Sequence, residues 1–299
     1  MKRLSLVSLL VGTVLSVSFF GCTKSNNSSP IQNQLVYEVT LSTSPTLGQY
    51  LVDKDGFTLY FFSNDYQGRN NCPGGCAALW PYFNAGTLTQ ANIGNGLLLA
   101  DFDTINVGGT IQTRYKGWPL YYYAPSVAGG YGGSSNVREA PGLTGGEAYG
   151  NIWFVAKPDY SIMLANGQLL GNDGMNYIST YVQGLGKTLY FTDPRGNTLY
   201  TFSKDSANIN KFTHADLGNN SVWPIYETSQ VVVPSILDKT LFSSINVFGK
   251  IQLTYKGWPL YYFGADNYVM GNNKGISVPL PGVWPVAVQN IMNAPSKTP

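Results

Sequence analysis

The sequence predicts an all-β protein, and three observations lead to this prediction. Aromatic residues make up 14% of the 299 residues, with 21 tyrosines, whereas apolar residues rarely recur with a helical period. The 34 glycines and 17 prolines are scattered between short apolar runs, as turn residues are between strands. A seven-residue phrase occurs four times, and its Leu-Tyr-x-aromatic ending alternates with the period of two that is typical of a strand.

The four copies of the phrase form two pairs with the same internal spacing. The copies begin at Gly56, Gly117, Gly196 and Gly257, so they are 61, 79 and 61 residues apart. This spacing predicts two homologous domains, residues 36–159 and 187–290, each built from two hairpin-plus-strand units. A single ring of four propeller-like blades is the alternative, because four like units could also bury their faces against one another. Residues 160–186 are expected to be a structured connection, and residues 291–299 a C-terminal tail.

Each unit is expected to contain a tight hairpin and a later strand that begins near a tryptophan. In the first unit, Gln49–Val52 and Thr58–Phe62 flank Asp53–Gly56, where glycine accepts a positive φ at little cost. One leucine of each phrase should face the core in an equivalent position, because strand side chains alternate between faces. These leucines are Leu59, Leu120, Leu199 and Leu260. One tryptophan per unit is expected to fill the core rather than to bind a ligand, because it buries a large area. These tryptophans are Trp80, Trp153, Trp223 and Trp284.

The N-terminus has the layout of a secretory signal peptide. Met1–Arg3 is basic, and Leu4–Phe20 is almost wholly apolar. A transmembrane anchor is the alternative interpretation, but a run of about 17 residues lies at the lower limit for crossing a membrane. The sequence therefore predicts export from the cytoplasm.

Cys22 is the predicted site of lipid attachment. The segment Phe19–Cys22 resembles a bacterial lipobox, which implies that residues 1–21 are removed and that Cys22 becomes the lipidated first residue. Residues 22–35 then form a polar, flexible tether. We expect a protein anchored through this lipid to the bacterial cell envelope, at the outer membrane.

The charge of the chain argues against a nucleic-acid partner. Only 11% of the residues are charged and the formal net charge is +2. Nucleic-acid-binding proteins carry a basic patch or stripe, and the sequence contains none.

Residues that carry metal or catalytic chemistry are scarce. Cys72 and Cys76 are the only cysteines besides Cys22, and in an exported chain such a pair is typical of a disulfide. A redox-active or metal-binding pair is the alternative, but no other cysteine or histidine lies nearby in the sequence. His214 is the sole histidine, which leaves little material for a zinc site or a catalytic triad. No metal, cofactor or catalytic residue is predicted.

Two weaker patterns remain. Asp53–Gly56 resembles the opening of a calcium loop, but turn aspartates that accept backbone hydrogen bonds explain the same residues. Tyr122 and Tyr262 lie in tyrosine runs that place aromatic rings on both faces of a strand. One face should be core, and the other could stack on a flat ligand or a sugar, so both residues are candidate binding aromatics.

Three segments fit a Tyr-x-aromatic-x-x-Asp motif. They are Tyr60-x-Phe62-x-x-Asp65, Tyr200-x-Phe202-x-x-Asp205 and Tyr261-x-Phe263-x-x-Asp266. Together with Cys72–Pro81 and Tyr115–Tyr121, they resemble the bacterial secreted-repeat lipoprotein family that carries this motif, whose function is generally unknown. The resemblance extends over roughly residues 49–158 and 187–288. The chain departs from the pattern at Ser126, where the motif has aspartate, and in its second half, which lacks the cysteine pair.

The function predicted from these features is that of a non-catalytic envelope lipoprotein, with a binding or structural role at the cell surface. Its partners would be the membrane, through the lipid, and an envelope protein or a glycan. A redox or electron-transfer accessory protein is one alternative, suggested by the cysteine pair and the many aromatic residues. A carbohydrate-binding or carbohydrate-active protein is the other.

Overall fold

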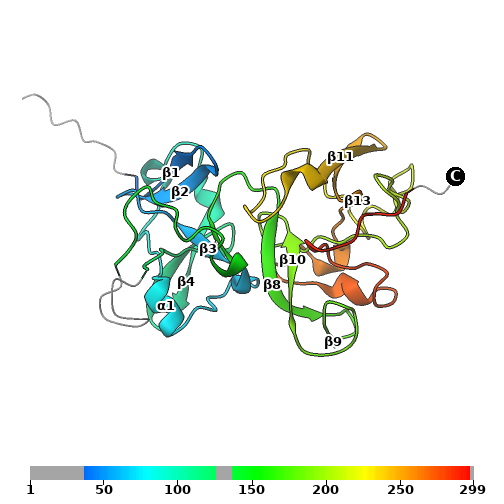
Figure 1. The fold of residues 1–299 in the computed structure, drawn as a ribbon, viewed down its shortest axis with the longest axis horizontal. Helices are drawn as coiled ribbons and strands as arrows, with labels where there is room; N and C mark the ends of the chain where they lie inside the picture. The colour runs from blue at the N-terminus through cyan, green and yellow to red at the C-terminus, as the bar shows by residue number, and fades with distance from the viewer. Residues whose placement is uncertain (1–36, 126–136, 297–299) are drawn as a thin grey trace, which may run out of the picture. The chain divides into compact units, whose positions relative to one another are not determined.

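Short antiparallel strands make up most of the regular structure in the computed structural model, which describes residues 37–125 and 137–296 (Figure 1). The expected signal peptide, the lipid attachment at Cys22, the whole expected tether and the last three residues of the expected tail (297–299) lie outside the described residues. The described residues form one compact unit. We call residues 37–159 the first half and residues 160–296 the second half.

The strands follow a similar order in the two halves. The first half contains β1 (Val39–Ser44), β2 (Gly48–Asp53), β3 (Tyr60–Phe62), β4 (Phe102–Val107), β5 (Thr110–Tyr115), β6 (Trp118–Pro119) and β7 (Trp153–Val155). The second half contains β8 (Met163–Leu170), β9 (Asn176–Tyr177), β10 (Lys187–Thr192), β11 (Phe242–Val247), β12 (Lys250–Tyr255) and β13 (Trp258–Pro259). One short α-helix, α1 (Gly75–Leu79), is the only α-helix in the described residues.

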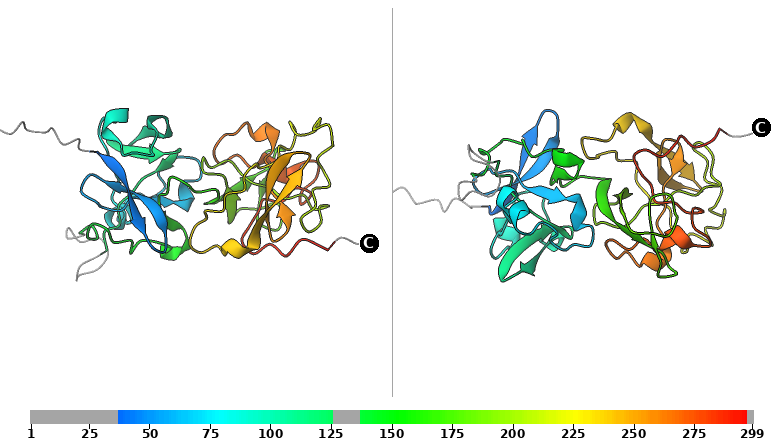
Figure 2. Two further views of the ribbon diagram at one scale, coloured as in Figure 1. Left: turned by 90° about the horizontal axis from the view of Figure 1, so that it is seen from above. Right: turned by 60° about the horizontal axis from the view of Figure 1, so that its bottom comes forward.

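The strands form five small sheets of two or three strands, which confirms the all-β prediction (Figure 2). The sheet β4-β5-β6 has the same order and pairing as β11-β12-β13. The hairpin β1–β2 corresponds to the pairing of β8 with β10. Strand β8 lies in residues 160–186, so the segment expected to connect the halves also supplies the first strand of the second half. None of the sheets in the described residues closes into a barrel.

The repeated phrases cross each other in pairs at the centre of each half. Tyr60 and Tyr121 exchange both backbone hydrogen bonds, at 2.9 and 3.0 Å, and Tyr200 and Tyr261 exchange theirs at 2.8 and 2.9 Å. The first unit therefore pairs with the second, and the third with the fourth. The two units of each pair are related by a local pseudo-twofold axis. The four phrase leucines all have 0% exposure, which confirms their equivalent burial.

Aromatic rings fill the core between paired units. Trp80 stacks on Trp153 with centroids 3.8 Å apart, and Trp223 stacks on Trp284 at 3.7 Å. All four rings are at most 3% exposed, which confirms that these tryptophans fill the core.

The first half also buries an aromatic face beneath residues of the second half. The ring centroid of Phe61 lies 5.2 Å from that of Trp118 and 6.0 Å from that of Tyr160. Met163 and Pro194 line the same closed space, whose volume is about 10 Å³. Because this face is filled, it leaves no room for a ligand.

Candidate functional site

Buried tyrosine–carboxylate pairs occupy the centre of each half. In the second half, Tyr200 donates its hydroxyl proton to Asp266 Oδ2 at 2.5 Å, and Tyr261 donates to Asp205 Oδ2 at 2.7 Å. Each motif tyrosine thus binds the aspartate of the other copy and not the one five residues further along its own copy. The two copies of the Tyr-x-aromatic-x-x-Asp motif therefore bind each other where their segments cross. We call this reciprocal pair of tyrosine–carboxylate hydrogen bonds the clasp.

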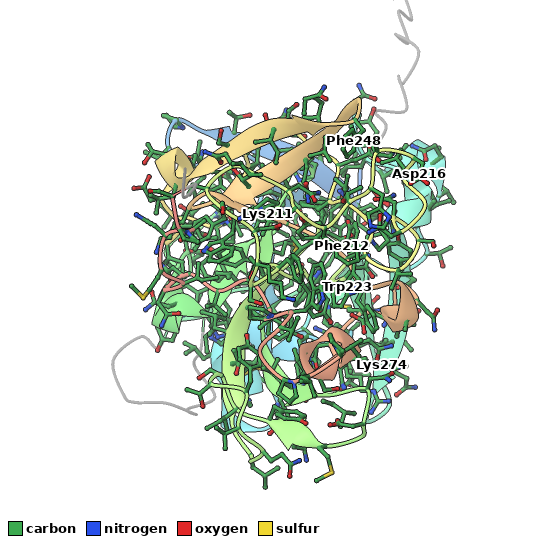
Figure 3. The ribbon with its side chains drawn as sticks, turned by 90° about the vertical axis from the view of Figure 1, so that its right-hand side faces the viewer. Lys211, Phe212, Asp216, Trp223, Phe248 and Lys274 are labelled. Atoms are coloured by element: carbon green, nitrogen blue, oxygen red, sulfur yellow. A yellow bond between two sulfur atoms is a disulfide. The ribbon has the colours of Figure 1, made fainter. Side chains whose placement is uncertain are left out.

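The second carboxylate oxygen of each aspartate accepts a hydrogen bond from the backbone of a loop. Asp205 Oδ1 accepts the backbone N–H of Lys211 at 2.7 Å, and Asp266 Oδ1 accepts that of Lys274 at 2.9 Å. Figure 3 labels both lysines. Both aspartates are at most 5% exposed. This geometry joins two strands and two loops and leaves neither carboxylate open to a substrate.

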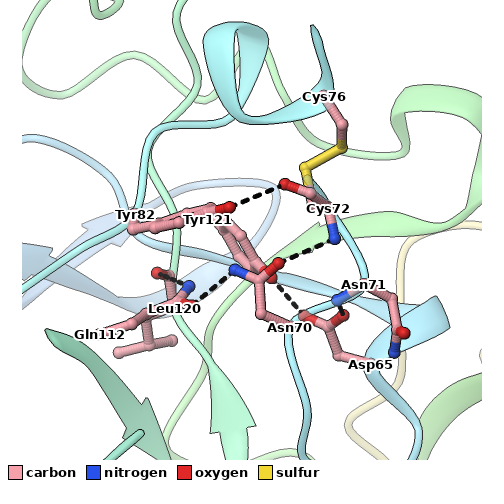
Figure 4. The surroundings of a disulfide bond; sticks show 9 residues. All are labelled: Asp65, Asn70, Asn71, Cys72, Cys76, Tyr82, Gln112, Leu120 and Tyr121. Carbon is pink, nitrogen blue, oxygen red and sulfur yellow. Dashed lines mark hydrogen bonds between the residues drawn. A yellow bond between two sulfur atoms is a disulfide. The ribbon is translucent and has the colours of Figure 1, made fainter. Parts of the chain in front are cut away.

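The first half has the same clasp with one replacement. Tyr121 donates to Asp65 Oδ2 at 2.6 Å, and Asp65 Oδ1 accepts the backbone N–H of Asn71 at 2.7 Å (Figure 4). The second copy of this half has Ser126 instead of aspartate. Tyr60 donates to Glu139 Oε1 instead. Only the exchanged pairing reveals that Ser126 leaves Tyr60 in need of another acceptor, and nothing in the sequence singled out Glu139.

Burial controls the protonation of these groups. It raises the pKa of Asp65 to about 7 and the pKa of Asp205 and Asp266 to about 6, against hydrogen bonds that lower it. Burial also raises the pKa of Glu139. The paired tyrosines have pKa values well above their usual range for the same reason, so each hydroxyl remains a donor at neutral pH.

The disulfide predicted between Cys72 and Cys76 is present, with a Cα–Cα distance of 5.1 Å (Figure 4). Cys72 is 0% exposed, and its carbonyl accepts the Tyr82 hydroxyl at 3.1 Å. The second half has Phe212, labelled in Figure 3, at this position, and its ring packs edge-on against Trp284 with a centroid distance of 4.8 Å. A disulfide and a phenylalanine thus fill equivalent positions, which indicates a packing role.

Within residues 37–125 and 137–296, no three His, Cys, Asp or Glu side chains converge as a metal site would require. His214 is exposed on the surface. Asp53 Oδ1 accepts the backbone N–H groups of Asp55 and Phe57 at 3.0 and 2.9 Å, as a turn aspartate does.

The two candidate binding tyrosines have internal partners. Tyr122 donates to Asp53 Oδ2 at 2.8 Å, and Tyr262 donates to Asp193 Oδ2 at 2.9 Å. The Arg138 guanidinium lies 4.3 Å from the ring centroid of Tyr122, and Tyr268 packs edge-on against Tyr262 at 5.2 Å. Both tyrosines are half-buried, and each already has at least two neighbours against its ring.

A groove in the second half offers a more open aromatic surface. Trp258 is half-buried, whereas the other five tryptophans are at most 3% exposed. We call the hollow beside it, of about 360 Å³, the Trp258 groove. It is lined by Ser179, Tyr181, Thr201, Ser203, Trp258, Pro285, Val286, Val288, Asn290 and Ile291.

The groove is open because small residues replace aromatic ones. Thr201 occupies the phrase position of Phe61, and Pro285 follows Trp284 as Phe154 follows Trp153. Trp258 itself corresponds to the fully buried Trp118. Both tryptophans directly follow the glycine of their phrase, and only their tertiary surroundings distinguish them.

Comparisons with known proteins support the repeat assignment. Residues 42–84 match the model of a family described as "Secreted repeat of unknown function" (Lipoprotein_15), which confirms the suspected resemblance over that segment. No curated protein and no solved structure matches the chain. The part of the chain that the structure describes contains no helix with the length and hydropathy of a membrane span.

Proposed function

We propose that the chain is a non-catalytic binding protein of the bacterial cell envelope. The match of residues 42–84 to a secreted-repeat family supports the export of the protein. The openness of the Trp258 groove is the observation that carries this proposal, because the equivalent face of the first half is filled. Concave sites with an aromatic wall and a few polar groups are the usual form of small-ligand sites.

The lining of the groove supports a non-catalytic role. The residues lining the groove include no carboxylate, histidine or cysteine, so it lacks a general acid, a general base and a nucleophile of these types. The buried carboxylates of the clasps each face one tyrosine and a loop N–H. Their role is to hold the crossing segments together.

The redox alternative finds less support. The one disulfide of the described residues joins a fully buried Cys72 to Cys76, and the equivalent position of the second half carries Phe212. An exchangeable disulfide must be accessible to an attacking thiolate, and the burial of Cys72 leaves only the half-buried Cys76 for such an attack.

The envelope location rests on the N-terminal sequence. We propose that a lipid on Cys22 anchors the protein at the outer membrane and that residues 22–35 serve as a tether. Replacement Cys22→Ala should abolish incorporation of radiolabelled palmitate and release the protein from the membrane fraction. A variant that remains anchored would refute this part of the proposal.

Photo-crosslinking in cells tests the binding role without assuming a ligand. A benzophenone amino acid at Val288, inside the groove, should give adducts that disappear when Thr201→Phe fills the groove. The same group at Ile251, which is 40% exposed on β12, serves as the surface control. Equal adducts at both positions, or none at Val288, would contradict the proposal.

A further inference from the structure

We propose that the Trp258 groove and its continuation bind an uncharged glycan chain. This inference rests on the proposed binding function and names the ligand chemistry. It depends on the size of the hollow, on its lining and on the contrast with the first half.

The hollow extends beyond the Trp258 groove. A second space of about 530 Å³ adjoins it and shares Ser179, Val288 and Asn290 with it. The remaining residues that line this second space are Thr180, Lys187, Thr188, Leu189 and Gln289. Two connected spaces of this size suit an elongated ligand with several similar parts better than one compact molecule.

The polar lining consists almost entirely of hydroxyl and amide groups. The exposed side chains of Ser179, Thr180, Ser203 and Asn290 rim the two spaces. Lys187 is the one charged residue among those that line them. A single cation is too little for a nucleic acid or another polyanion, whose binding depends on several basic groups. Neutral hydroxyl and amide groups match the hydroxyl groups of a sugar.

The aromatic lining provides an apolar wall. The Trp258 Nε1–H donates to the Met292 carbonyl at 2.7 Å, which holds the indole in place before a ligand arrives. Tyr181 lines the same space and is half-buried. A sugar ring has an apolar C–H face and a polar rim, so it can pack one face on an aromatic ring while its hydroxyl groups bind the edges of the groove.

Two buried hydroxyl groups favour a polar occupant. Thr188 Oγ1 and Thr201 Oγ1 have no hydrogen-bond partner in the structure, and their residues are 5% and 1% exposed. Each residue lines one of the two spaces. Buried polar groups normally have a partner. A sugar hydroxyl that enters these spaces can provide the missing partner, whereas a lipid chain cannot.

A peptide strand fits the groove less well. Strand β10 is the edge of its sheet, but the Phe191 N–H already donates to the Ala287 carbonyl at 2.8 Å. Only Lys187 and Leu189 remain to offer an outward backbone edge. Strand addition gains its affinity from a row of backbone hydrogen bonds, and two residues supply few of them.

Titration calorimetry on the full-length protein tests the proposal. The probes are chitotetraose, cellotetraose and maltotetraose as uncharged glycans, tetragalacturonate as an anionic glycan, and an unstructured octapeptide. At least one uncharged tetrasaccharide should bind. Trp258→Ala should weaken that binding at least tenfold, and Thr201→Phe should abolish it.

The control variant is Ile251→Ala, which lies on the exposed surface of β12 outside the groove and should bind like the wild type. Thermal unfolding must show that all variants fold. The proposal is overturned if none of the three uncharged glycans binds, if both groove variants bind normally, or if tetragalacturonate or the peptide binds more tightly. A polypeptide adduct at Val288 in cells would refute the glycan while leaving the proposed binding function intact.

Discussion

Tyr261 binds the carboxylate of Asp205, 56 residues earlier, and not that of Asp266, which completes its own copy of the motif. Asp266 in turn binds Tyr200, 66 residues away. Each copy of the motif thus supplies one tyrosine and one aspartate, and each of these binds its counterpart in the other copy. This relationship explains why tyrosine and aspartate recur together in the sequence.

The exchanged pairing predicts which residues are energetically coupled. A double-mutant cycle with Tyr261→Phe and Asp205→Asn should give a coupling energy within the range of about 0.5–3 kcal/mol seen for residues in contact. The same cycle with Asp266→Asn, which keeps the sequence spacing but not the contact, should give a much smaller value. Urea unfolding measures both. A larger coupling to Asp266 would show that the clasp is not exchanged.

The buried carboxyl groups predict a stability that falls as pH rises. Burial raises the folded-state pKa of Asp65 to about 7 and that of Asp205 and Asp266 to about 6, above the value of about 3.9 in unfolded chains. The folded protein therefore binds more protons than the unfolded chain between about pH 4 and pH 7. The contribution of these groups is fully present below about pH 4 and is lost progressively up to about pH 7.

Urea unfolding at several pH values tests this dependence. The slope should approach about −1.4 kcal/mol per pH unit for each group that titrates in this window. Asp65→Asn should make this slope less negative, whereas Asp55→Asn, at an exposed position, should leave it unchanged. A free energy of unfolding that rises between pH 4 and pH 7, with the same slope in the Asp65 variant, would contradict the prediction.

The two tryptophan environments predict opposite effects on stability. Trp223→Ala removes a ring stacked 3.7 Å from Trp284 and should cost about 3–5 kcal/mol, as for other buried aromatic truncations. Trp258→Ala removes a half-buried ring beside a groove and should cost far less. Denaturant midpoints of the two variants decide the matter, and similar losses would mean that Trp258 is also a core residue.

The phrase leucines predict a third contrast. Leu59→Ala and Leu199→Ala should each cost about 2–5 kcal/mol, because both side chains are 0% exposed in equivalent positions. Ile251→Ala, on the surface of a hairpin and 40% exposed, should cost much less. Unequal losses at the two leucines, with one near the value for Ile251, would argue against equivalent units.

The disulfide should be a minor contributor to stability. It closes a loop of only four residues in separation, so its entropic effect should lie below the ~3 kcal/mol of a 15-residue loop. Replacing both cysteines by alanine should therefore leave a folded protein with a modestly lower free energy of unfolding. Thiol titration of the unfolded wild type without reductant should detect neither cysteine. A variant that does not fold, or two free thiols, would contradict this expectation.

Features that depend on local pattern followed from the sequence by itself. The all-β class, the burial of the four phrase leucines, the burial of Trp80, Trp153, Trp223 and Trp284, and the pairing of Cys72 with Cys76 were all predicted correctly. Each depends on side-chain alternation, on turn residues or on short sequence separation. Residues 160–186, expected to be a structured connection, contain strands β8 and β9.

Tertiary structure alone decided which residues meet. The partner of Tyr60 is Glu139, 79 residues away, because that segment folds back to where the motif has no aspartate. Tyr122 and Tyr262 donate hydrogen bonds to buried carboxylates, whereas Trp258 lies beside a groove. The Trp258 groove is open because Thr201 and Pro285 occupy the positions that Phe61 and Phe154 occupy in the first half. In addition, Tyr160, Met163 and Pro194 of the second half line the equivalent face of the first half. Burial and hydrogen-bond partners depend on segments far apart in the chain, so local sequence could not reveal them.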